Sequence, residues 1–148
     1  MRAPQTVIIG LCALAAACSP PDRSFPGGPF PQAVEMKCTL KPVHSGVLNP
    51  TYFTDRGGEA LELRIRLQDR TTGRAEILGN SGSAEVELRQ SSKQLQLIET
   101  TPMGSMTITT VFAPPTADEP MPAVHSRHIQ IAPANVAVSQ YAGSCEAA

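Results

Sequence analysis

The chain has 148 residues, which is enough for one domain. Its 12 Lys and Arg residues against 13 Asp and Glu give a net charge of −1, which excludes the dense basic surface that nucleic-acid binding needs. With no Trp, 2 Tyr and 4 Phe, the chain has too few aromatic faces for a platform that stacks bases or sugars.

Residues 1–17 have the pattern of a secretory signal peptide. Met1 and Arg2 give a short positive start, Val7–Ala17 carries no charge, and Ala15–Ala17 supplies small residues at a cleavage site. The uncharged run is shorter than the roughly 20 apolar residues of a membrane-spanning helix. We therefore expect this segment to be removed on export.

The stretch Leu14-Ala15-Ala16-Ala17-Cys18 resembles the lipobox of bacterial lipoproteins. The resemblance implies a lipid on Cys18, cleavage before it, and an outer-membrane anchor facing the periplasm, since Ser19 follows the cysteine. The match departs at Ala15, where lipoboxes favour a larger aliphatic residue. Cleavage after Ala-x-Ala, giving a secreted or periplasmic protein without lipid, remains the alternative.

The cysteines predict one disulfide. Of the four, Cys12 leaves with the signal and Cys18 carries the lipid, so Cys38 and Cys145 remain, one near each end of the folded region. An even remainder in an oxidising compartment indicates a bridge. For a loop of about 100 residues, the chain-entropy model gives about 4.7 kcal/mol of stabilisation.

A tether is expected between the anchor and the fold. Ser19–Gln32 holds five prolines and two glycines, which disfavour both helix and ladder. In polyproline II form it would hold the domain on the order of 40 Å from the membrane. The predicted organisation is a signal peptide over 1–17, a lipidated cysteine and tether over 18–33, and a β domain over 34–148.

From residue 34 the hydrophobic period is two, which is typical of half-buried strands. The clearest case is Glu59–Asp69, where apolar and charged residues alternate strictly. Arg74–Leu78 is ambiguous between helix and strand, and the proline-rich Ala113–Pro122 is expected to be a long exposed loop. The other predicted strands are Val34–Leu40, Ala84–Gln90, Lys93–Glu99, Ser105–Phe112, Ala123–Ala132 and Val136–Tyr141.

These elements predict an all-β fold: a single small antiparallel β-barrel or β-sandwich of seven or eight strands, closed by the disulfide between its first and last strands. We expect Glu59–Asp69 and Ala84–Gln90 to be neighbours that share one apolar interior and pair their outward charges. The expected interior residues are Leu61, Leu63, Ile65, Leu67, Val86 and Leu88. The expected outer face consists of Glu62, Arg64, Arg66, Glu85, Glu87 and Arg89.

The tetrapeptide His125-Ser126-Arg127-His128 is the strongest site candidate. On a strand, a spacing of three sends the two histidines to opposite faces, so we predict no metal site. His125 and Arg127 share a face and could form a binding edge. The competing interpretation is the polar end of an otherwise buried strand face.

We find no catalytic constellation and predict neither an enzyme nor a cofactor. No G-x-S-x-G motif occurs, so a nucleophile elbow is missing. The stretch Gly79-Asn80-Ser81-Gly82-Ser83 lacks the lysine and the helix of a phosphate loop.

The C-terminal stretch that ends at Cys145 and Glu146 resembles the ends of short, uncharacterised secreted proteobacterial β-domain proteins. The general outline also resembles periplasmic inhibitors of lysozyme, although their recognition loop is not found here. The first likeness implies no activity, and the sequence does not determine the function. The best interpretation is a non-enzymatic, envelope-anchored binding module, inhibitor-like in outline, that contacts a protein or glycan. The alternative is a structural accessory lipoprotein of an envelope or secretion assembly. The oligomeric state stays open.

Binding is expected away from the mixed-charge sheet face, which offers no field of a single sign. The candidate places are the loops Asn49–Gly58 and Ala113–Pro122 and the surroundings of His125 and Arg127.

Overall fold

A computed structural model describes Phe30 and residues 35–48, 53–116 and 118–148. The predicted signal peptide, Cys12, the predicted lipid site Cys18 and nearly all of the tether lie outside these residues. No helix in the described ranges is long and apolar enough to cross a membrane.

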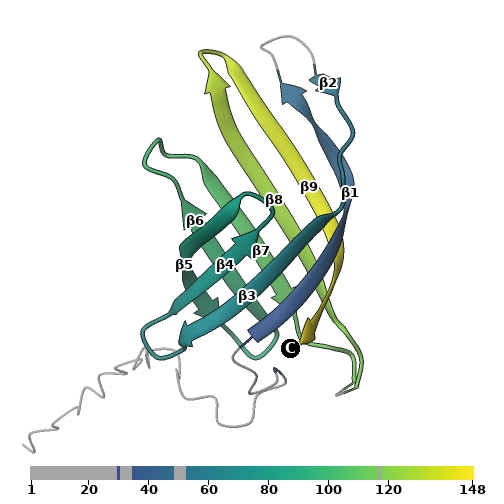
Figure 1. Ribbon diagram of the computed structural model, residues 1–148, viewed down its shortest axis with the longest axis vertical. Coiled ribbons are helices and arrows are strands. Elements are labelled where there is room, and N and C mark those ends of the chain that lie inside the picture. Colours follow the sequence, from purple (N-terminus) through teal and green to yellow (C-terminus); the bar gives the residue numbers. More distant parts are fainter. Residues whose placement is uncertain (1–29, 31–34, 49–52, 117) are drawn as a thin grey trace, which may run out of the picture.

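The described residues form nine strands in one antiparallel sheet, and eight of these strands close into a barrel (Figure 1). β1 pairs with β3 on one side and with β9 on the other, which closes the ring, while the short β2 extends the far end of β1. The structure therefore confirms an all-β fold and shows a barrel. The strands are β1 Glu35–Leu48, β2 Phe53–Asp55, β3 Leu61–Asp69, β4 Arg74–Gly79, β5 Gly82–Gln90, β6 Gln94–Thr100, β7 Met106–Phe112, β8 Met121–Ala132 and β9 Asn135–Ala147.

The ambiguous stretch Arg74–Leu78 belongs to β4, which pairs with β3 and β5 and separates them. The predicted pairing of Glu59–Asp69 with Ala84–Gln90 is therefore wrong. The reason is a tight turn: the Oδ1 atom of Asp69 accepts hydrogen bonds from the backbone N–H groups of Thr71 and Thr72. Gly73 completes the turn at φ 73°, a left-handed conformation that favours glycine.

The predicted interior is confirmed although the two strands are not neighbours, because the side chains of every barrel strand alternate between inside and outside. Leu63, Ile65, Leu67, Val86 and Leu88 are buried in one core, and Leu61 packs at its edge. The rest of the buried hydrophobic core comes from the other strands and from the segment before β1. These residues are Phe30, Met36, Cys38, Leu40, Ala75, Leu95, Leu97, Val111, Met121, Ala123 and Cys145.

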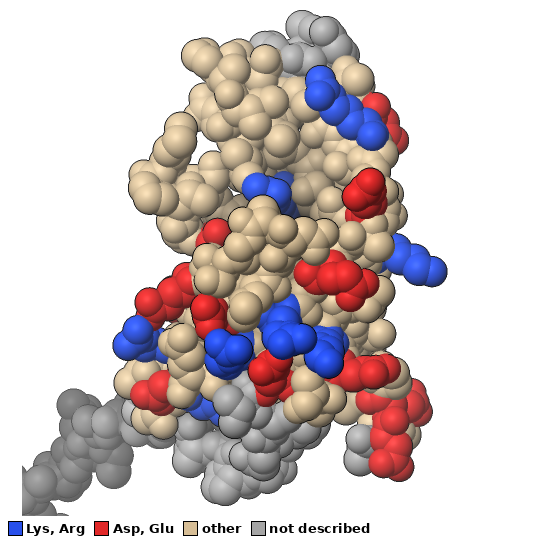
Figure 2. All heavy atoms as spheres, viewed as in Figure 1, with Lys and Arg blue, Asp and Glu red and all other residues tan. Residues whose placement is uncertain are grey.

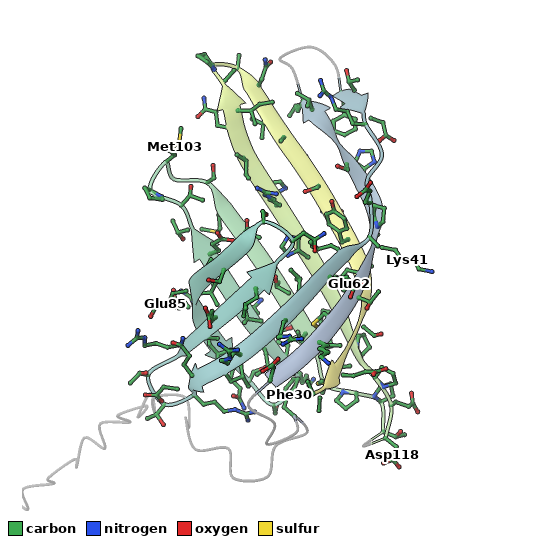
Figure 3. All side chains as sticks on the ribbon, viewed as in Figure 1. Phe30, Lys41, Glu62, Glu85, Met103 and Asp118 are labelled. Atoms are coloured by element: carbon green, nitrogen blue, oxygen red, sulfur yellow. A yellow bond between two sulfur atoms is a disulfide. The ribbon has the colours of Figure 1, made fainter. Side chains whose placement is uncertain are left out.

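Phe30 closes one end of the barrel. It is 2% exposed and belongs to the hydrophobic core, and Figure 3 places it at the lower end, where β1 begins. The predicted tether runs to residue 33, so its aromatic residue at position 30 is in fact part of the folded core. The apolar interior therefore lies at the end where the chain enters the barrel, which we call the closed end.

The predicted disulfide is present between β1 and β9. Cys38 and Cys145 are register partners, and their Cα atoms lie 3.9 Å apart, below the usual range of about 4.4–6.8 Å. Two residues along, a Cβ on Gly143 would lie 2.1 Å from the carbonyl oxygen of Thr39 and 3.0 Å from the Cα of Leu40. A glycine at position 143 thus permits the close approach of the first and last strands.

The mixed-charge outer face exists, but its ion pairs differ from those predicted. Because β4 lies between β3 and β5, Arg66 pairs with Glu76, and Glu85 pairs with Arg74. Figure 2 shows these charges gathered over β3, β4 and β5 in the lower half of the view. Exposed pairs of this kind contribute only about 0.2–1 kcal/mol each, so they serve solubility more than stability.

Three strands are longer than the others and rise above the far end of the barrel (Figure 1). β1, β8 and β9 have 14, 12 and 13 residues, whereas β3 to β7 have 6 to 9. The turn between β4 and β5 stops at Asn80 and Ser81, well below the tips of the long strands. The far end is therefore an open mouth with one tall wall and one low rim.

Candidate functional site

A pocket of about 220 Å³ occupies this mouth, at the opposite end of the barrel from Phe30. Figure 2 shows the surface hollowed above the β4–β5 hairpin, against the long strands. The lining residues come from β3 to β8 and from the hairpin tip. They are Leu61, Leu63, Ile77, Gly79, Asn80, Ser81, Gly82, Ser83, Ala84, Glu99, Thr101, Thr107, His125, Arg127 and Ile129.

Two rows of inward-facing side chains form the polar wall of the pocket. In the upper row, Thr107 of β7 is the register partner of Glu99 on β6 and of Arg127 on β8. In the row below, Thr109 stands opposite His125. Farther down, the inward positions are apolar, so polarity inside the barrel increases toward the mouth.

Glu99 and Arg127 are the only Lys, Arg, Asp or Glu residues in β6, β7 and β8. Both line the pocket, whereas the ionic residues of β3 lie mostly on its outer face. Arg127 is exposed and Glu99 is half-buried, and neither forms an ion pair or a side-chain hydrogen bond within the described ranges. The mouth thus holds two opposite charges that other protein groups leave open to a ligand.

His125 lies below these charges and is buried. Its Nδ1 atom is 2.9 Å from the hydroxyl oxygen of Thr109, and its ring meets the ring of Tyr141 edge to face, with centroids 5.9 Å apart. Burial, with a smaller contribution from the positive charge of Arg127, lowers the pKa of His125 to about 4. At neutral pH the imidazole is therefore uncharged, and the floor of the pocket is polar without being ionic.

The structure places both candidate residues, His125 and Arg127, in the mouth of the barrel. His128 points outward and is exposed, which confirms the opposite faces predicted for the two histidines. Ile131 lies six residues after His125, a spacing that regular alternation assigns to the same face, but a register shift between Gln130 and Ala132 displaces it, and it is 56% exposed.

The loops named as candidates lie at two different ends. Ala113–Pro122 is at the closed end, where Figure 3 labels Asp118, and its last two residues belong to β8, so the loop is shorter than predicted. Of Asn49–Gly58, residues 49–52 lie outside the described residues. A Cβ on Gly58 would stand 3.5 Å from the hydroxyl of Tyr141, whose ring contacts that of His125.

Sequence reasoning missed Glu99 and Thr107. Glu99 is the last residue of the predicted strand Lys93–Glu99 and was not considered as a site residue. The sequence nevertheless contains a signal. Three consecutive strands carry a single acid and a single base, and both fall at alternating positions whose other members, Leu95, Leu97 and Ala123, are buried. The turn Gly79–Ser83, dismissed as a phosphate loop, forms the low rim of the same pocket.

In the described part of the chain, no group of three or more His, Cys, Asp or Glu side chains is placed to hold a metal ion. Comparison with family models, curated proteins and solved structures finds no match for this chain. The function is therefore inferred from the residues and geometry of the mouth.

Proposed function

We propose that this protein is a non-enzymatic binding module, anchored to the cell envelope, that holds a group of a protein or glycan partner in the mouth of the barrel. One observation carries the proposal: Glu99 and Arg127, the only ionic residues of three strands, face into a pocket and lack partners among the described residues. Ligand pockets are typically lined by apolar side chains with a few polar or charged groups that fix the orientation of the ligand, which is the composition of this mouth.

The position of the chain entry supports an anchored receptor. Phe30 and the start of β1 lie at the closed end, opposite the mouth (Figure 3). A lipid on Cys18 would therefore hold the closed end toward the membrane and turn the mouth toward the periplasm. The loop Ala113–Pro122, at the closed end, would face the membrane and is the weaker candidate for partner contact.

Site-specific photo-cross-linking in intact cells tests this proposal with the full chain. A cross-linking side chain at Thr101, on the mouth, should capture a partner, and one at Glu119, near the closed end, should not. Capture at Glu119 alone would place recognition at the closed end and overturn the proposal. Circular dichroism of each variant, together with an intact Cys38–Cys145 bridge, controls for folding.

A second function, a structural accessory lipoprotein, is favoured by one observation. The outward positions of β6, β7 and β8 carry no Lys, Arg, Asp or Glu, and Met106, Phe112 and Val124 are exposed there. Uncharged faces with exposed large apolar residues are typical of packing surfaces. If this function holds, Val124→Glu should abolish partner capture, whereas a mouth-based module should tolerate the change.

A further inference from the structure

We infer that the mouth of the barrel binds an α-amino-acid zwitterion, either free or as a head group displayed on a larger envelope molecule. The inference rests on the proposed function and names the chemistry of the ligand. Arg127 would receive the carboxylate, and Glu99 would receive the ammonium group.

The two charged residues of the mouth, Glu99 and Arg127, have opposite signs. A ligand that is only an anion would be attracted by Arg127 but repelled by Glu99. A ligand that is only a cation would be attracted by Glu99 but repelled by Arg127. A molecule that carries both charges satisfies both residues at once. Charge-assisted hydrogen bonds are stronger than neutral ones, so a ligand with both charges should be favoured over a ligand with one.

The spacing of Glu99 and Arg127 also supports a zwitterionic ligand. Because Glu99 and Arg127 flank Thr107 on adjacent strands, their backbones lie two strand spacings apart, roughly 10 Å. Both side chains line the same pocket, so one ligand in that pocket can contact both. The hydroxyl of Thr107 stands between them and makes no hydrogen bond within the described ranges, so it can contact either charged group of a ligand.

The pocket has room for a small ligand group. Its volume of about 220 Å³ is roughly seven times the share of about 30 Å³ that one water occupies in the liquid, which is enough for an amino-acid head group. Apolar surface from Leu61, Ile77 and Ile129 lines the rest of the pocket. A zwitterionic head with a short aliphatic side chain therefore matches both the charges and the apolar wall.

The test uses the mature full chain and calorimetry with defined probes. L-Leucine carries both charges, N-acetyl-leucine lacks the ammonium group and leucinamide lacks the carboxylate. Nε-acetyl-lysine presents the zwitterion on a long arm, as a displayed head group would. We expect leucine or Nε-acetyl-lysine to bind at least tenfold more tightly than either singly charged probe, and the stronger of the two distinguishes a free ligand from a displayed one.

Two variants assign the charges. Arg127→Gln should weaken zwitterion binding tenfold or more and should not weaken leucinamide, because that probe has no carboxylate for Arg127 to bind and its positive charge is repelled by Arg127. Glu99→Gln should weaken zwitterion binding in the same way and should not weaken N-acetyl-leucine, whose negative charge is repelled by Glu99. The matched controls are Arg89→Gln and Glu87→Gln, which remove one cation or one anion from an exposed pair on β5.

Equal binding of all probes, or zwitterion binding that survives both mouth variants, would overturn the inference. So would the absence of binding by leucine and Nε-acetyl-lysine. If cross-linking at Thr101 still captures a partner, only the ligand class is wrong and the proposed function stands. Loss of both signals would remove the proposed function as well.

Discussion

Cys38 and Cys145 face each other across the seam where β1 and β9 close the barrel, with their Cα atoms 3.9 Å apart. The bridge joins the first and last barrel strands and spans 107 positions of the chain. It therefore links covalently the two paired strands that lie farthest apart in sequence. Pairing these strands closes the ring, and its loop-closure cost is the largest in the fold.

Removing the bridge should lower the stability of the barrel strongly. The double variant Cys38→Ala, Cys145→Ala loses the stabilisation that the disulfide provides by closing a long loop in the unfolded chain, up to about 4.7 kcal/mol in the chain-entropy model. Urea unfolding followed by circular dichroism measures the loss. A midpoint that is unchanged in the variant, and in wild type with reductant, would show that the seam is stable without the bridge.

Gly143→Ala should destabilise the same seam. The added Cβ would meet the backbone of Thr39, which cannot move without opening the β1–β9 pairing, so we expect a loss of about 1–3 kcal/mol in the free energy of unfolding. Gly79→Ala is the control, since its Cβ would meet only the side chain of Leu63 at 3.4 Å. Equal effects of the two substitutions in thermal unfolding would contradict a special contact at Gly143.

The stability of the protein should depend on the protonation of His125. Its pKa falls from 6.5 to about 4 on folding, so between these values the unfolded chain binds a proton that the folded chain does not. Stability therefore rises with pH across this window and levels off above about 6.5, with a slope of at most about 1.4 kcal/mol per pH unit from this group.

His125→Gln should flatten that part of the stability curve, whatever its effect on stability at pH 7. Urea unfolding at several pH values between 4 and 7 provides the measurement, and the exposed His128→Gln is the control. If the two variants keep the same slope as wild type, then His125 is not the group that titrates.

The anchor prediction rests on sequence alone. Cys18→Ser should abolish incorporation of a lipid label and shift the protein from the membrane fraction to the soluble fraction. Unchanged membrane association together with unchanged labelling would remove the lipoprotein interpretation and leave simple cleavage of the signal.

Strand alternation predicted the interior well because a period of two follows directly from the pleat. Leu63, Ile65 and Val86 all point inward as expected. The neighbour of β3 was not predictable in the same way, because Arg74–Leu78 is short and starts with an arginine. Only the turn at Asp69 and Gly73 reveals that the chain reverses there.

Only part of the candidate site in the mouth could be predicted from the sequence. His125 and Arg127 stand out in the sequence as a local cluster, but Glu99 lies 28 positions before Arg127 and becomes its neighbour only through the register of β6, β7 and β8. Barrel closure, and the extra length of β8 and β9, make a mouth out of these positions. A period of two assigns a side chain to a face, but it does not give its height in the barrel.

The central claim, that the mouth is the binding site, is tested most directly by amide chemical shifts of the mature protein titrated with soluble fragments of native envelope. We expect shifts that saturate at Glu99, Thr107 and Arg127, while Arg89 on the outer face and Glu119 at the closed end remain unchanged. Saturating shifts confined to the closed-end loop or to the outer face of β7, with the three mouth residues unmoved, would contradict the claim.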